Sequence, residues 1–274
     1  MNCLFPFPEL WDFPARLPLH QALKAILVGM NVQPRDHTKA TPLEPKMFLE
    51  ALASHVTKLQ RRKFRYKMQH DASEVLGYIL DELFAAGLDR RVVCSSLATS
   101  YRCQVCLVSK SAHVSDVKEP ILHLDISESV STALQTRLSG DNVTVYCENC
   151  KSDQECVEQL SFSNLPDVLI LRLRRDQYEE GQGTRRSGRE VDCERRLTIG
   201  SGLGENIPPA TYQLVAVSHH IGESLSSGHY TSTLIDPHPK RKFMWMYNDR
   251  LIERARTLDQ RTAFILFYHK EKGQ

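Results

Sequence analysis

The 274-residue sequence lacks any long hydrophobic run and any strong excess of charge of one sign. No apolar stretch approaches the roughly 20 residues that a helix needs to cross a bilayer, so no membrane span is predicted. The first residues, MNCLFPFPELWDFP, have neither the basic start nor the continuous apolar core of a secretory signal peptide. The net charge of +2 argues against a strongly basic nucleic-acid binder or a membrane-surface protein. No internal repeat or long linker is visible.

The composition is that of a folded soluble protein, with 41% hydrophobic and 25% charged residues. Its length allows one large domain or two small ones. Helical patterns come first, at residues 19–30, 46–59 and 71–86, and mostly short strand-like runs follow, including 168–173 and 262–269. Helices followed by strands predict an α+β fold. The charged segment 174–196 has no apolar period and is expected to be a loop.

The clearest helix is the one at residues 71–86. Its apolar residues fall on one stripe at helical spacing: Val75, Leu76, Ile79, Leu80, Leu83 and Phe84. Asp71 and Glu74 stand three residues apart at its start, like a capping box with an acidic first residue. Both would cap backbone N–H groups and complement the helix dipole. Gly87 is the expected stop.

Cysteines are the next distinctive feature. Four of the eight form two Cys-x-x-Cys pairs, Cys103/Cys106 and Cys147/Cys150. Pairs so close in sequence form a metal knuckle more naturally than a structural disulfide, which also indicates a reducing compartment. We therefore expect a structural zinc ion with four cysteine ligands that fastens two long β arms. The alternative is four free thiols. Cys94, Cys156 and Cys193 have no spacing partner and are expected to be buried or incidental thiols.

The stretch from Tyr212 to Asp249 carries the candidate chemistry. Residues 212–217, 230–235 and 243–247 are expected to be strands, separated by loops that contain Gly222 and Gly228. Two neighbouring antiparallel strands would bring the imidazole of His229 beside the amide of Asn248. A histidine oriented by an Asn or Asp is two-thirds of a nucleophile–base–orienter triad. The alternative is a hairpin histidine beside a turn.

These pieces also form an ordered set of motifs. The set comprises Gln69-His70-Asp71-Ala72-Ser73-Glu74-Val75-Leu76, the two cysteine knuckles, Leu165–Arg175, Tyr212-x-Leu-x-Ala-Val with His220-x-Gly and Gly228-His229-Tyr230, and Tyr247-Asn248-Asp249. The set resembles the ubiquitin-specific protease family of deubiquitinating cysteine peptidases. The resemblance implies a single catalytic domain with a papain-like fold: a helical thumb at 1–91, zinc-bearing fingers at 92–163 and a β-sheet palm at 164–274.

The resemblance also implies site residues and partners. His229 would be the general base, Asn248 its orienting residue, and Asp249 an adjacent catalytic residue. The ubiquitin-binding residues would be Gln69, Asp71, Glu74 and Tyr230. Carboxylates pair well with guanidinium groups, so Asp71 and Glu74 would face the arginines of ubiquitin's C-terminal tail, and Tyr230 would line the tail channel. The partners would be ubiquitin or ubiquitinated proteins, without nucleic acid or membrane, in the cytoplasm or nucleus.

The N-terminus departs from the family pattern. Only Asn2-Cys3-Leu4-Phe5 and Pro8-Glu9-Leu10 match the region of the nucleophile box, and in that register the nucleophilic Cys falls before Met1. We therefore expect an N-terminally truncated catalytic domain, with Cys3 as the candidate thiol nearest the right place. A second departure is Met244 where the family has Trp, with Trp245 one residue later, so a shift or bulge is expected in that strand.

Three functions follow as hypotheses. The first is a thiol-dependent deubiquitinase that hydrolyses the (iso)peptide bond at the C-terminal Gly of ubiquitin. The second is a catalytically inactive ubiquitin-binding pseudo-protease. The third is a zinc-ribbon nucleic-acid binder that uses the basic run Lys58–Lys67, against which the net charge and the histidine motif both argue.

Overall fold

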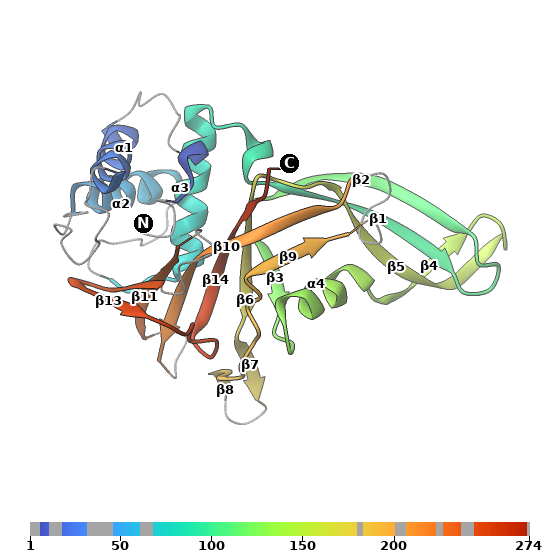
Figure 1. Cartoon of the computed structure of the whole chain (residues 1–274). Helices are drawn as coiled ribbons and strands as arrows, with labels where there is room; N and C mark the ends of the chain where they lie inside the picture. Colours follow the sequence, from blue (N-terminus) through green and yellow to red (C-terminus); the bar gives the residue numbers. More distant parts are fainter. Residues whose placement is uncertain are drawn as a thin grey trace.

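The computed structural model describes residues 6–10, 18–31, 46–60, 68–179, 183–200, 207–222, 227–236 and 244–272. Helices α1–α3 gather on one side of a large β-sheet, and a long arm of four strands projects from the other side (Figure 1). The α+β class predicted from the order of elements is confirmed. Among the described residues, no helix is long and apolar enough to cross a membrane.

The helical part follows the predicted pattern. It contains the short 3₁₀ helices η2 (Pro8–Leu10) and η4 (Arg90–Val92), and the α-helices α1 (Pro18–Asn31), α2 (Lys46–Gln60) and α3 (Ala72–Ala86). Helix α3 begins where predicted because the Asp71 carboxylate accepts hydrogen bonds from the backbone N–H groups of Ser73 and Glu74, at 2.7 and 3.2 Å. It ends at Gly87, whose φ of 108° suits glycine best.

The large sheet has eight strands. Seven run in the order β13-β12-β11-β10-β14-β6-β3, and β9 pairs with β10. The strands are β3 (Leu122–Asp125), β6 (Val168–Arg174), β9 (Arg196–Ile199), β10 (Ala210–Ile221), β11 (His229–Ile235), β12 (Met244–Asn248), β13 (Leu251–Ala255) and β14 (Ala263–Lys270). Its pairs are antiparallel except β3 with β6.

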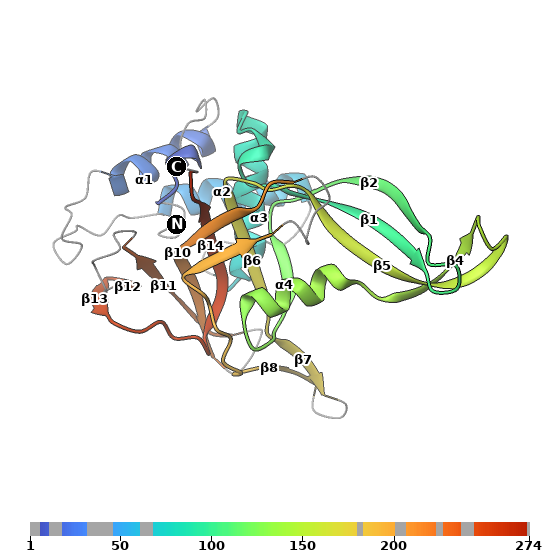
Figure 2. The same ribbon diagram turned by 45° about the vertical axis from the view of Figure 1, so that its right-hand side comes forward.

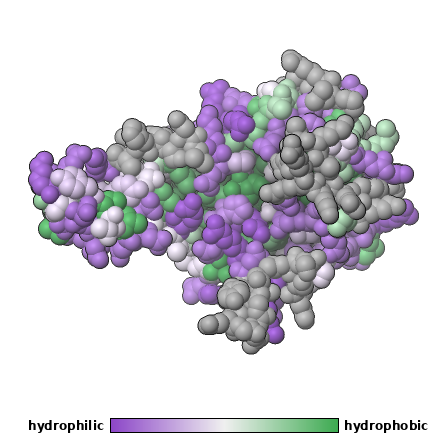
Figure 3. Space-filling view, turned by 180° about the vertical axis from the view of Figure 1, so that it is seen from behind, coloured by the Kyte–Doolittle hydropathy of each residue, from purple (hydrophilic) through white to green (hydrophobic). Residues whose placement is uncertain are grey.

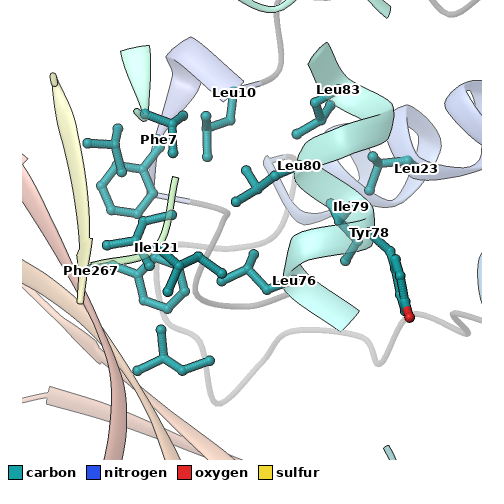
Figure 4. Packing of buried hydrophobic residues seen from close by; sticks show 14 of the residues in the cluster. Phe7, Leu10, Leu23, Leu76, Tyr78, Ile79, Leu80, Leu83, Ile121 and Phe267 are labelled. Carbon is teal, nitrogen blue, oxygen red and sulfur yellow. The ribbon is translucent and has the colours of Figure 1, made fainter. Parts of the chain in front are cut away.

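The sheet is buried on both faces. In β6, Val168 and Ile170 pack in the core beneath α1–α3, whereas Leu169 and Leu171 belong to the core on the opposite face, under α4 (Val130–Ser139). This alternation explains why β6 reads as a continuous aliphatic run. Figure 4 shows the first core, where the leucines of α3 face Phe7, Phe267 and Ile121. Each fully buried leucine there contributes about 2 kcal/mol to folding.

The arm is a second sheet with the strand order β2-β1-β5-β4. Its strands are β1 (Ser95–Cys103), β2 (Ser109–Glu119), β4 (Asn142–Cys147) and β5 (Ser152–Asn164). It runs outward from the large sheet and the two cysteine knuckles lie at its far end (Figure 2). The arm's surface is mostly hydrophilic, with some hydrophobic residues at the tip (Figure 3). The exposed apolar side chains of this tip include Val105, Leu107, Val108 and Tyr146.

Three features of the fold differ from the expectation. Helix α4 lies in the part of the chain where mostly short strand-like runs were predicted. It forms because the Ser129 hydroxyl caps its first turn, at 3.1 Å from the Thr132 N–H, and because its few apolar residues bury against the sheet. The expected loop 174–196 contains a hairpin, β7 (Asp176–Glu179) with β8 (Gly183–Arg186). Strand β13 was not predicted from the sequence either.

The hairpin is anchored by Arg175, which is fully buried. Its guanidinium donates to the backbone carbonyls of Ala263, Gln260, Arg189 and Ser187, at 2.6 to 3.1 Å. A buried cation is tolerated there because carbonyl oxygens meet its N–H groups.

The prediction of a shift or bulge near Met244 is wrong. Strand β12 pairs in regular register with β11, where Met244 stands opposite Ile235 and Trp245 opposite Leu234. Met244 and Trp245 are both buried, and they belong to the cores on opposite faces of the sheet. The methionine therefore occupies its inward position without any insertion.

Candidate active site and metal centre

The predicted meeting of His229 and Asn248 is confirmed. His229 opens β11, Asn248 ends β12, and these two strands are antiparallel neighbours. The His229 Nε2 atom lies 2.6 Å from the Asn248 Oδ1 atom. An amide oxygen only accepts, so the imidazole must donate its Nε2–H to it. In the neutral ring this leaves Nδ1 with a lone pair, able to take up a proton.

The ring is also accessible, since 45% of the His229 side chain is exposed. The neighbouring Asp249 plays a smaller part in the geometry. Its carboxylate lies 4.0 Å from His229 Nε2, beyond hydrogen-bond distance, and its side chain is 81% exposed. The Asp249 backbone has a φ of 50° because it sits in the tight turn between β12 and β13.

Gly228 allows the backbone just before His229 to lie close to β10. A Cβ atom at this position would lie 2.1 Å from the His220 Nε2 atom and 2.8 Å from the Ile221 carbonyl oxygen. The imidazole of His220 in turn stacks on the ring of Tyr230, with centroids 4.7 Å apart. The start of β11 is therefore pressed against β10 in a way that only glycine permits.

The N-terminal end of α3 contacts the start of β11, next to His229. The Gln69 side chain donates to the Gly228 carbonyl oxygen at 3.4 Å, and the Ala72 N–H donates to the Tyr230 hydroxyl at 3.3 Å. Burial raises the pKa of Tyr230, so its hydroxyl stays protonated. The structure thus brings together the sequence-predicted residues Gln69, Asp71 and Tyr230 beside the strand that carries His229.

Glu74 lies in the first turn of α3 and lines a cavity of about 530 Å³. Its carboxylate accepts a hydrogen bond from the Tyr78 hydroxyl at 2.7 Å. The cavity lies between α3 and the β3 edge of the sheet, and its lining includes Gly77, His123, Arg137 and Arg174. A smaller cavity of about 60 Å³ lies among Asp71, Tyr230, His220 and Phe264. The lining of the larger cavity therefore carries both acidic side chains, Glu74 and Glu119, and basic ones, Lys118, Arg137 and Arg174.

The four cysteines of the two knuckles form a candidate metal centre. Their sulfur atoms all lie within 4.8 Å of one another, with Cys103 to Cys150 at 3.9 Å and Cys106 to Cys147 at 3.6 Å. Sulfurs bound tetrahedrally to zinc at about 2.3 Å would be about 3.8 Å apart. The four sulfurs could therefore hold a zinc ion.

The two knuckles share a backbone conformation. The residue after the second cysteine of each pair has a positive φ, 62° for Leu107 and 55° for Lys151. In the first knuckle backbone N–H groups point at the sulfurs, and the N–H of Cys106 lowers the pKa of Cys103 to about 6. A thiolate at Cys103 suits a metal ligand.

Other cysteines have simpler surroundings. Cys94, Cys156 and Cys193 are buried thiols, as expected. Burial raises the pKa of Cys193 to about 12, so it is an inert thiol. Cys3 and residues 61–67 of the basic run lie outside the described residues. Two features of the site were not predicted from the sequence: Arg172, which contacts Asp71, and the role of Gly228.

Comparison with solved structures identifies the fold. The chain matches the structure of the SAGA Ubp8/Sgf11/Sus1/Sgf73 DUB module bound to ubiquitin aldehyde with a TM-score of 0.77 and 18% identity, covering 100% of this chain and 66% of that one. A yeast SAGA DUB module with a mutant Sgf73 gives 0.71 at 19% identity, covering 100% and 65%. The chain therefore shares the fold of Ubp8.

Sequence comparison gives the family. Residues 8–268 match the model of the ubiquitin carboxyl-terminal hydrolase family, so the chain belongs to this family. "Ubiquitin carboxyl-terminal hydrolase 12" of Salmo salar is 27% identical over 84% of this chain and 73% of its own length. "Ubiquitin carboxyl-terminal hydrolase 23" of Arabidopsis thaliana is 25% identical over 77% of this chain, which spans 26% of that protein.

Proposed function

We propose that the chain is a deubiquitinase domain that hydrolyses the (iso)peptide bond after the C-terminal glycine of ubiquitin. The observation that carries the proposal is the 2.6 Å contact between His229 Nε2 and Asn248 Oδ1. Membership of the family over residues 8–268 supports it. The likeness in fold to the Ubp8 module, which was solved bound to ubiquitin aldehyde, supports it further.

In this proposal His229 acts as general base and acid. Its Nδ1 atom takes the proton of a cysteine thiol, and the thiolate attacks the carbonyl carbon of the terminal glycine. The imidazolium then protonates the departing amine as the C–N bond breaks, which leaves a thioester. A water molecule, deprotonated by the same imidazole, hydrolyses the thioester and restores the thiol. Asn248 holds the ring in the tautomer that these steps need.

The nucleophilic thiol is not assigned among the described residues. Of the described cysteines, four form the metal centre and the other three are buried in the fold. Cys3 is the candidate for the role within the chain. The second candidate function is that of an inactive ubiquitin-binding pseudo-protease, in which the same fold binds ubiquitin without turnover.

The proposed substrate-binding residues lie where the N-terminal end of α3 contacts β11. We infer that Gln69, Asp71, Glu74 and Tyr230 guide the C-terminal tail of ubiquitin toward His229, with Asp249 supporting the catalytic turn. The four knuckle cysteines hold a structural zinc ion, whose tetrahedral shell leaves no position for substrate. The thumb, fingers and palm span 1–91, 92–163 and 164–274, and the protein acts in the cytoplasm or nucleus.

The test combines two reagents. A fluorogenic ubiquitin amide reports turnover, and ubiquitin with a C-terminal electrophile labels the nucleophile, which peptide mapping then identifies. His229→Ala should lower turnover by about 10³-fold or more, and Asn248→Ala by less. Asn142→Ala, on the arm, is the matched control and should leave turnover unchanged. Saturable ubiquitin binding without turnover or labelling would establish the pseudo-protease, and absence of binding would refute both functions.

A further inference from the structure

Arg172 projects from β6 toward the N-terminal end of α3. Its Nη2 atom lies 3.4 Å from Asp71 Oδ2 and 3.2 Å from Asp176 Oδ2. The guanidinium also lies over the ring of Phe264, 5.0 Å from the ring centre, and 15% of the side chain is exposed. The guanidinium of Arg172 therefore contacts the Asp71 carboxylate, which in the proposed function binds the tail of ubiquitin.

The Asp71 carboxylate is consequently engaged at both oxygens. Oδ1 accepts the N–H groups that cap α3 and the hydroxyl of Ser73, while Oδ2 faces Arg172. A tail arginine could pair fully with this carboxylate only after Arg172 moves aside. Glu74 has a different partner, since its carboxylate accepts a hydrogen bond from the Tyr78 hydroxyl, and it borders the 530 Å³ cavity. The competition from Arg172 therefore concerns the Asp71 carboxylate.

Arg172 is held more weakly than the other inward arginine of the same segment. Its ion pairs are 3.2 and 3.4 Å long, and its Nη1 atom lies 3.4 Å from the His123 Nδ1 atom. Its Nε atom is buried without a hydrogen-bond partner in the part of the chain that the structure describes. Arg175, by contrast, donates to four backbone carbonyls. A guanidinium with long contacts and one unmet donor is displaceable at low cost.

We propose that Arg172 is a specificity-determining residue, an internal competitor that a basic side chain of the modifier's tail must displace from Asp71. The inference rests on the proposed function and deepens it. Arg172 screens the Asp71–Asp176 carboxylates and so weakens the binding of a tail that carries arginine at this point. A tail with a neutral residue there is not penalised. The residue thus sets how strongly the cleft discriminates between basic and neutral tails.

The experiment measures the Kd of the chain for ubiquitin and for ubiquitin with its tail arginines replaced by glutamine. Arg172→Gln should tighten binding of unmodified ubiquitin about three- to fivefold, the scale of a partly exposed ion pair, and leave binding of the glutamine form unchanged. Asp71→Asn should abolish the gain. Arg172→Lys keeps the competing charge and should bind like the wild type. Arg196→Gln, which breaks the distant surface pair with Glu271, is the charge-matched control.

Thermal unfolding of each variant checks that the fold is intact. Weaker or unchanged binding of ubiquitin to Arg172→Gln would overturn the inference while leaving the proposed function in place. An equal gain with the glutamine tail would do the same, because it would show a general charge effect. Absence of saturable ubiquitin binding by the wild type and every variant would overturn the proposed function together with the inference.

Discussion

The large sheet and the projecting arm are built from similar antiparallel ladders but are stabilised differently. In β14 the first six residues are buried, whereas no residue of β4 is. The large sheet is covered on both faces by apolar cores, while the arm contributes Leu97 and Phe162 to a core only near its base. A sheet that buries so little apolar surface needs another source of stability. The four sulfur atoms at the arm's tip offer one.

The comparison also explains where the site lies. His229 and Asn248 are carried by strands of the buried sheet, so the surrounding core holds their spacing. The arm carries none of the proposed catalytic residues. Changes in the arm should therefore leave the spacing of His229 and Asn248 intact, whereas changes in the core of the large sheet should disturb it.

Metal removal should separate the two regions most strongly. Structural zinc contributes about 10–16 kcal/mol in small zinc-finger peptides, so a chelator or Cys147→Ser should unfold the arm. Hydrogen exchange measured by mass spectrometry should show lost protection at residues 95–103 and 142–164 and retained protection in β10 and β14. Cys193→Ala, which alters a buried thiol beside the large sheet, is the control. Unchanged exchange in the arm after complete chelation would disprove a structural role for the metal.

Truncation of a core side chain tests how far the large sheet, unlike the arm, depends on buried apolar surface for its stability. Leu266 is fully buried in β14, and Leu266→Ala should lower the free energy of unfolding by about 2–5 kcal/mol. Leu107 is 60% exposed at the arm's tip, and Leu107→Ala should change it by less than about 0.5 kcal/mol. Denaturant unfolding followed by tryptophan fluorescence measures both. Equal losses would mean that the tip is packed in a way that its exposure does not indicate.

Local patterns in the sequence were sufficient for some of this architecture. The period of α3 with its Asp71 and Gly87 caps, the spacing of the knuckle cysteines, and the meeting of His229 with Asn248 were all predictable. Each depends on residues close in sequence or on neighbouring strands. The capping hydroxyl of Ser129 was a signal that could also have revealed α4.

Other features depend on packing between distant segments. Arg175 stands in a charged run, and nothing local indicates that carbonyls from two separate segments, 187–189 and 260–263, surround it. Arg172 was partly predictable. If Val168 and Ile170 face the helices, the two-residue period of β6 sends Arg172 toward α3 as well. The missing information was the identity of the helix end that it meets.

Protonation of His219 should weaken the large sheet rather than the arm. This histidine is 3% exposed and lies within hydrogen-bond distance of the hydroxyls of Thr262 and Thr233. Burial lowers its pKa from 6.5 to about 4. The unfolded chain therefore binds a proton that the folded chain does not between these values, so stability present above pH 6.5 is lost as pH falls toward 4. The loss is at most about 3 kcal/mol.

His219→Gln keeps hydrogen-bonding capacity but cannot titrate. Its free energy of unfolding should depend less on pH between 6.5 and 4 than that of the wild type, as measured by denaturant titrations at several pH values. If the two pH profiles run parallel, His219 does not cause the acid sensitivity.

Replacing two glycines should give the smallest changes in the free energy of unfolding. The changes should have opposite signs, a gain in α3 and a loss where α4 joins the arm. Gly77 lies inside α3, where an added Cβ would meet no atom within 4 Å, so Gly77→Ala should raise the free energy of unfolding by about 0.5–1 kcal/mol. Gly140 joins α4 to the arm with a φ of 62°, and an added Cβ would lie 2.3 Å from the Glu158 carbonyl oxygen. Gly140→Ala should therefore lower stability by about 1 kcal/mol or more. Because Glu158 belongs to β5, the loss should appear as faster hydrogen exchange in the arm, whereas the gain at Gly77 should leave the arm's exchange unchanged.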